Sequence, residues 1–157
     1  MTTKEYLGRI YRLDLMIEAK ANEIEKIRTL ACKTTVPIEG ERVKSSPNPD
    51  KLTNTVAKLI ELEKDIDKKV DMFIRQRNII VSQIDEIEDT RCYDFLRLRF
   101  VEMLPMKEIK GKLGVEDSEL FRTQRKALQM FEKKYGNTYL KPGDQRELGN
   151  LVENGIK

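Results

Sequence analysis

Apolar side chains recur every three or four residues along two long stretches of this chain, and this spacing constrains the fold more than any other feature. The first series is interrupted only by Lys20, and its apolar members are Tyr6, Ile10, Leu13, Ile17, Ile24, Ile27 and Ala31. The second is interrupted by Glu63 and Arg77, and its apolar members are Leu52, Val56, Leu59, Ile66, Val70, Phe73, Ile80, Ile84 and Ile87. Heptad spacing of this kind places one apolar seam along each of two helices. The sequence therefore predicts an all-α protein in which residues 1–90 form a long antiparallel two-helix coiled-coil hairpin.

Residues 34–50 separate the two predicted helices and contain three prolines. Proline interrupts helices and also restricts the residue before it, so we predict a loop here. If Ala31 faces Leu52, antiparallel packing places Lys20 opposite Glu63, and we predict that this pair sets the register of the coiled coil. The alternative is that either side chain extends outward into solvent.

The second predicted helix is the longer one, and its last turns, residues 79–87, are apolar on more than one face. Something besides the first helix must cover this surface. We expect the following segment to cover part of it, through residues such as Phe95 and Phe100. A second copy of the chain would bury the remaining stripe, which includes Leu62 and Ile74, so we expect a homodimer.

A different pattern, typical of a helix-turn-helix unit, runs from residue 92 to residue 133. Ile109 and Leu113 lie four residues apart on one face of a short helix, and Gly114 follows directly. Glycine adopts the left-handed conformation that ends a helix abruptly, which lets the next helix leave at a steep angle. We therefore predict that residues 91–135 form a helix-turn-helix DNA-binding-like unit.

Further signals mark the ends of these helices. Pro105 suits the first turn of the leading helix, where its missing N–H has no partner to lose. Asp117 or Ser118 is expected to cap the second helix. Lys110 lies where most such units have alanine, and we expect its side chain to extend outward. Residues 136–157 are predicted to be a loosely ordered tail.

Four short segments of this unit follow one another in an order that resembles a known module. They are LRLRF at 96–100, EI at 108–109, LGV at 113–115 and RKAL at 125–128. This order resembles the fourth region of bacterial sigma factors, which reads the promoter element at minus thirty-five. With the N-terminal helices added, the chain resembles a small phage and prophage family related to late-operon regulators of the RinA and ArpU type. The resemblance implies transcription control on phage DNA.

The sigma-like resemblance also implies where DNA would be contacted: Ser118, Phe121, Arg122, Arg125 and Lys126. Arginine bonds bidentately to guanine in the major groove, so Arg122 is the strongest single candidate. Residues 91–135 carry eleven basic and seven acidic side chains, a net +4, whereas residues 51–90 carry seven basic and nine acidic, a net −2. The positive charge thus lies on the segment that would approach phosphates.

The absence of histidine from the chain removes the usual general base at neutral pH, so we expect no enzyme activity. Cys32 and Cys92 lack CxxC partners, and we expect reduced, partly buried thiols with no metal and no cofactor. We find neither a run of about 18 apolar residues nor a signal-peptide pattern, and therefore expect a cytoplasmic protein with no membrane contact.

Two other functions fit the same pattern. The first is a small terminase subunit, which packages DNA and also joins a helix-turn-helix to an oligomerising helical segment. The number of copies separates the two functions, because a terminase ring would contain many copies and a transcription regulator usually contains two. The other is an adaptor that contacts RNA polymerase and not DNA, since sigma-type modules also grip that enzyme. Glu116, Asp117 and Glu119 favour the adaptor, because they place negative charge at the start of the reading helix.

Overall fold

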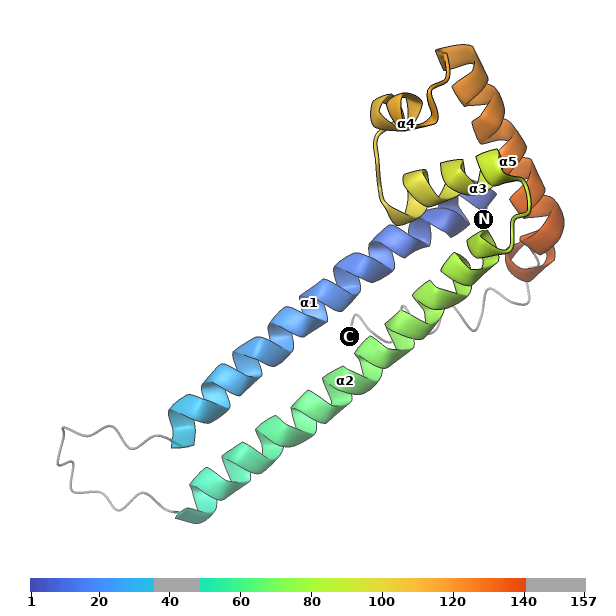
Figure 1. Ribbon diagram of the computed structural model, residues 1–157. Helices are drawn as coiled ribbons and strands as arrows, with labels where there is room; N and C mark the ends of the chain where they lie inside the picture. Colours follow the sequence, from blue (N-terminus) through green and yellow to red (C-terminus); the bar gives the residue numbers. More distant parts are fainter. Residues whose placement is uncertain (36–48, 141–157) are drawn as a thin grey trace. The chain divides into compact units, whose positions relative to one another are not determined.

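The computed structural model describes residues 1–35 and 49–140, and this part of the chain is helical with no strand (Figure 1). In chain order its elements are α1 (Thr3–Thr35), α2 (Pro49–Asp85), α3 (Thr90–Leu96), the short π-helix η1 (Arg97–Val101), α4 (Met106–Leu113) and α5 (Asp117–Tyr139). The all-α prediction is confirmed. The edges of the predicted loop are helical, and the rest of that loop lies outside the described residues. Of the predicted tail, residues 136–139 are helical, because α5 continues to Tyr139, and residues 141–157 lie outside the described residues.

The chain divides into two compact units. Unit 1 consists of Met1–Asp14 together with Arg75–Lys157, and unit 2 of Leu15–Ile74. The predicted boundary near residue 90 differs from this division. The start of α1 and the end of α2 belong to the same unit as α3, α4 and α5.

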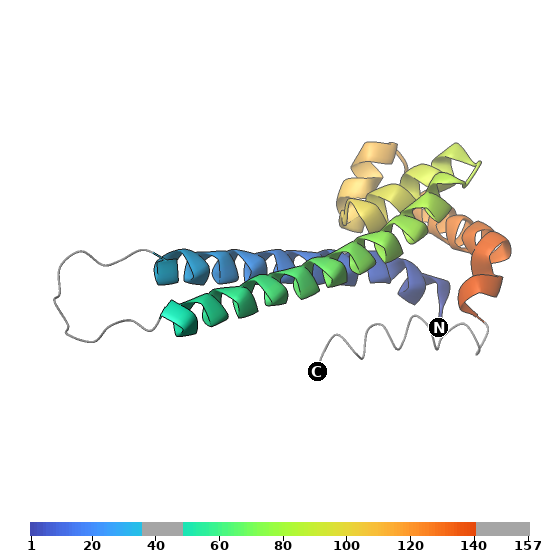
Figure 2. The same cartoon turned by 90° about the horizontal axis from the view of Figure 1, so that it is seen from below.

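In unit 2, α1 and α2 lie side by side and run in opposite directions (Figures 1 and 2). Ile24 and Ile27 of α1 and Ile66 of α2 form the buried centre, and Leu59 and Val70 pack against it. All of these residues belong to the two apolar series read from the sequence. Their burial shows why each stretch is amphipathic: one seam of each helix is removed from water by the other.

The predicted Lys20–Glu63 pair does not form. Lys20 Nζ donates a hydrogen bond to Glu23 of its own helix at 2.6 Å, while Arg28 donates to Glu63 Oε1 at 2.9 and 2.8 Å. Arg28, which binds Glu63, thus lies about two helical turns along α1 from Lys20, the predicted partner. The physical reason is that a heptad pattern repeats, so the same apolar seams also match after a shift of about one heptad. The apolar residues alone therefore did not determine the register.

All the helices of unit 1 contribute buried apolar side chains. Leu7 and Ile10 of α1 and Ile84 of α2 are fully buried. Helices α3, α4 and α5 also contribute fully buried residues: Phe95, Leu96, Ile109, Ala127 and Phe131. Phe95 and Phe100 are both buried, as is Ile87, whereas Ile79 stays 56% exposed. Most of the apolar surface at the end of α2 is therefore covered within the unit.

An aromatic cluster connects the start of α1 to the end of α5. The rings of Tyr6 and Tyr139 stack with centroids 4.3 Å apart, and Phe131 lies 6.1 Å from Tyr6. Thr3 donates a hydrogen bond to Glu132 at 2.7 Å, and its hydroxyl lies 2.9 Å from that of Tyr139. These contacts hold the end of α5 against the first turns of the chain.

Candidate functional site

The turn between α4 and α5 has the geometry expected of a sharp corner. Gly114 has φ 62° and ψ 38°, the left-handed conformation predicted for it. The N–H groups of Gly114 and Val115 both donate to the carbonyl of Lys110, at 3.0 and 3.4 Å, which closes the end of α4. Ile109 is fully buried on the inner side of this short helix. The chain can therefore reverse within a few residues and begin α5 at Asp117.

The helix starts differ in detail from the prediction. Pro105 is the residue before α4, with φ −68° and ψ 154°, rather than part of its first turn. At α5 the capping position is Glu116, which makes no side-chain capping hydrogen bond. Asp117 is already inside the helix, so the predicted cap at Asp117 or Ser118 is wrong. The helical backbone begins directly after Glu116, whose φ of −79° and ψ of 164° are extended, so the capping position lies one residue earlier than predicted.

Asp117 pairs with Lys110 across the turn. Lys110 Nζ lies 3.0 Å from Asp117 Oδ1 and 3.8 Å from Glu116 Oε2. The hydrogen bond to Asp117 raises the pKa of Lys110. Extending outward from α4, this lysine thus offsets part of the negative charge at the start of α5.

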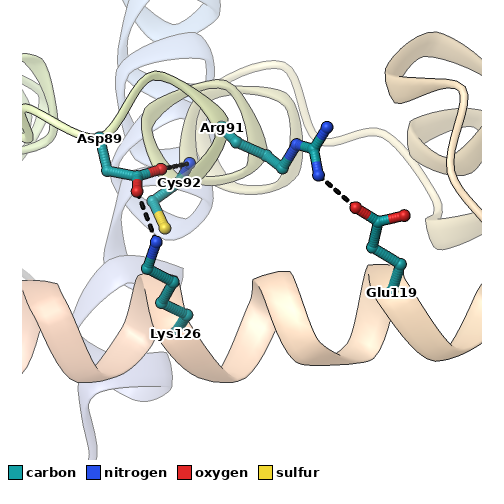
Figure 3. A network of polar contacts seen from close by, with 5 residues as sticks. All are labelled: Asp89, Arg91, Cys92, Glu119 and Lys126. Atoms are coloured by element: carbon teal, nitrogen blue, oxygen red, sulfur yellow. Dashed lines mark hydrogen bonds and ion pairs between the residues drawn. The ribbon is translucent and has the colours of Figure 1, made fainter.

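A second charged network joins the start of α3 to α5 (Figure 3). Asp89 caps α3 by accepting a hydrogen bond from the Cys92 N–H at 2.9 Å, and it also accepts one from Lys126 Nζ at 2.6 Å. The Lys126 ammonium, followed by the Cys92 N–H, holds the pKa of Asp89 well below its usual range. Burial, and then the neighbouring Asp89 carboxylate, raise the pKa of Cys92 to about 11. Lys126 is thus held in an ion pair within the molecule.

Arg91 and Glu119 form the other pair in the same view (Figure 3). Together with the contacts of Lys110, this pair gives each acidic residue at the start of α5 a cationic neighbour. These charges are partly exposed, so each pair is weak by itself. Arg91 and Lys110 thus offset part of the negative charge of the three acidic residues at the start of α5.

The other predicted contact residues lie together on the outer face of α5. Ser118, Phe121, Arg122 and Arg125 are exposed, whereas Leu120, Thr123 and Ala127 face the interior. Residues spaced by three or four share one side of a helix, and this spacing explains the grouping. Among the residues that the structure describes, no carboxylate pairs with either arginine. The structure therefore groups these residues, and the exposed Lys126 differs from them because its ammonium pairs with Asp89.

Gln129 belongs to the same face, although the sequence analysis did not select it. It is exposed and lies four residues beyond Arg125, continuing the series of 118, 122 and 125. Glutamine can bond bidentately to adenine in the major groove. Extending the helical spacing past Lys126 would have identified it.

The described residues contain no group of three or more histidine, cysteine, aspartate or glutamate side chains placed to hold a metal ion. Cys92 is buried, while Cys32, predicted to be partly buried, is exposed. Among the described helices, none combines the length and the apolar character needed to cross a membrane.

Comparison with known proteins gives one family. Residues 42–132 match DUF1492, a family of proteins of unknown function. The chain belongs to this family. No curated protein and no solved structure matches it. The matched region includes the whole candidate surface, Ser118 to Gln129, and begins after α1.

Proposed function

We propose that this protein is a phage- or prophage-type transcription regulator that binds DNA through α4, the turn at Gly114 and α5. In this proposal α1 and α2 form a coiled-coil hairpin, α4 and α5 form a sigma-like helix-turn-helix, and α5 enters the major groove. The N-terminal part of such a reading helix contacts base edges. The side chains placed to do so are those on its exposed face: Ser118, Phe121, Arg122, Arg125 and Gln129.

The observation that carries this proposal is the contrast between the cations of α5. Lys126 is engaged by Asp89, whereas Arg122 and Arg125 are exposed with no ion pair to any described residue. An arginine without an intramolecular partner loses no existing contact when it binds guanine or phosphate. The pairs made by Lys110 and Arg91 support the proposal too, because they lower the repulsion between the acidic start of α5 and DNA.

The hairpin would supply self-association. Ile60, Leu62 and Ile74 of α2 remain exposed, so unit 2 retains apolar surface that a second copy could bury. A dimer would carry two reading helices and would match a paired DNA site.

The proposal is tested by DNA binding of the full chain to fragments of the genome that encodes it, measured by fluorescence anisotropy across a salt series. We expect fragment-selective binding that weakens as salt rises. Arg122→Ala and Arg125→Ala should each weaken it by roughly 5- to 150-fold, about 1–3 kcal/mol. Lys58→Ala, an exposed cation of unit 2, is the matched control and should change affinity little. Absence of binding to every fragment at low salt would contradict DNA reading.

A second candidate is an adaptor that binds RNA polymerase through the same face. Phe121 favours it, because this large ring is 59% exposed on the outer side of α5. Exposed aromatic residues are typical anchors of protein interfaces. If the DNA experiment is negative, loss of binding to purified RNA polymerase in Phe121→Ala would identify this function.

A further inference from the structure

Unit 1 contains a small apolar cavity between the start of α1 and the last turns of α2. Its volume is about 70 Å³, and it is lined by Tyr6, Arg9, Leu13, Gln76, Ile79 and Ile80. The surface that this lining exposes is almost wholly apolar. Water needs polar partners in such a space, so the cavity favours an apolar occupant. Ile79 is 56% exposed and belongs to the wall, which gives an occupant access from solvent.

The end of α5 lies close to this cavity. Tyr6, which lines the cavity, stacks on Tyr139 with ring centroids 4.3 Å apart. Leu140 follows Tyr139 directly and is itself 45% exposed. The chain that continues from Leu140 therefore starts near the cavity, beside a second apolar side chain that remains in contact with water.

The residues that follow Leu140 have a sequence suited to this surface. Residues 141–157 lie outside the described part of the chain, and their aliphatic side chains are Leu148, Leu151, Val152 and Ile156. Leu148 comes eight residues after Leu140, a separation that an extended chain spans over roughly 26 Å. The length of this segment is therefore sufficient to bring an aliphatic side chain to the cavity.

The rim of the cavity carries a positive charge that matches the same segment. Arg9 lines the cavity, and no carboxylate of the described residues lies within ion-pair distance of its guanidinium. Burial lowers the pKa of Arg9, and the positive charge of nearby Arg12 lowers it further. Glu147 and Glu153 flank the aliphatic residues and supply carboxylates for this rim. Such exposed pairs are weak, so apolar contact must provide most of the binding free energy.

We propose that residues 141–157 dock on unit 1 and place an aliphatic side chain of the group 148–152 in this cavity. The other side chains of that group cover Ile79 and Leu140, and the carboxylates stay at the rim beside Arg9. The composition of the segment by itself predicts a loosely ordered tail, because the apolar surface that it needs comes from residues far away in sequence. The proposal is independent of DNA reading, since the cavity is lined by α1 and α2 and not by α5.

The first test is NMR of the full chain with isotope-labelled methyl groups of leucine, isoleucine and valine. We expect nuclear Overhauser contacts between the methyl groups of residues 148–152 and those of Leu13, Ile79 or Ile80. A mixture of labelled and unlabelled chains, observed with isotope filtering, separates contacts within one chain from contacts between copies. Contacts between copies only would identify a second copy as the occupant and overturn the proposal, as would the absence of any contact.

The second test changes the docking surface. Ile79→Asn should make amide hydrogen exchange at residues 147–153 roughly tenfold faster than in the parent chain. Ile60→Asn, which changes an exposed isoleucine of α2 in unit 2, is the matched control and should leave that exchange unchanged. Exchange at residues 120–131 of α5 reports on the fold of unit 1 and should be the same in both variants. Equal exchange at residues 147–153 in the parent chain and Ile79→Asn would contradict docking at this cavity.

Discussion

Asp89 illustrates how one side chain can serve two elements. Its Oδ1 accepts the Cys92 N–H at the start of α3, and its Oδ2 accepts from Lys126 of α5 (Figure 3). Capping satisfies a backbone donor that the helix itself leaves unpaired, and the ion pair connects two helices. The two roles are separable, because asparagine retains a capping oxygen but loses the charge.

We predict that Asp89→Ala lowers the free energy of unfolding by about 1 kcal/mol, the usual loss for a capping residue. Asp89→Asn should lower the free energy of unfolding by less, since this variant loses only the ion pair. Urea denaturation of both variants measures the difference. Equal losses in the two variants would show that the cap contributes nothing.

The part of the folding stability that depends on the charge of Asp89 should also vary with pH. The pKa of Asp89 is lowered by its hydrogen bonds to Lys126 and the Cys92 N–H, so the folded state favours the ionised carboxylate. Its stabilising contribution is therefore complete above the unfolded pKa of about 4 and declines as pH falls further, towards the folded pKa. The stability gap between the parent chain and Asp89→Asn should accordingly narrow below pH 4.

At the scale of elements, the corner between α4 and α5 depends on one backbone conformation. Gly114 has φ 62°, while the space where its Cβ would lie is open, with no atom within 4 Å. Gly111 lies in the second turn of α4, and its Cβ position is equally open. The two glycines thus differ in backbone conformation and not in crowding.

We predict opposite effects of alanine at these positions. Gly114→Ala should lower stability by about 1–2 kcal/mol, because an L-residue is strained at positive φ. Gly111→Ala should raise it by about 0.5–1 kcal/mol, because alanine favours the helix. Thermal denaturation measures both, and destabilisation of similar size in each variant would contradict the conformational explanation.

At the scale of the whole molecule, the beginning of the chain completes unit 1. The first turns of α1 lie outside the region matched by the family, yet Tyr6 and Leu7 are buried, and Tyr6 stacks on Tyr139. The end of α5 therefore depends on residues more than a hundred positions away in sequence.

Tyr6→Ala should lower stability by roughly 3 kcal/mol, as expected for truncating a buried aromatic residue. It should also speed amide hydrogen exchange at residues 131–139 of α5. Tyr11→Ala is the matched control, because that ring is mostly exposed. Unchanged exchange at the end of α5 in Tyr6→Ala would show that the cluster does not hold this helix in place.

Local patterns were sufficient to predict the helices and the corner between α4 and α5. Apolar spacing indicated the two long helices, and the left-handed preference of glycine indicated the end of α4 at Gly114. The exposed face of α5 follows from the same spacing, whereas Ser118, Phe121, Arg122 and Arg125 were selected from the sigma-like resemblance. These properties depend on residues a few positions apart, so the sequence alone determines them.

Pairings between distant residues were decided only by the tertiary structure. Lys20 was predicted to pair with Glu63, whereas Glu63 binds Arg28, and no local pattern indicated that Lys126 binds Asp89. Nor did any local pattern indicate that the start of α1 belongs to the same unit as Tyr139. A repeating apolar seam is compatible with several registers, and an exposed lysine with several carboxylates. Which of them forms depends on packing over the entire unit, and no local pattern contains that information.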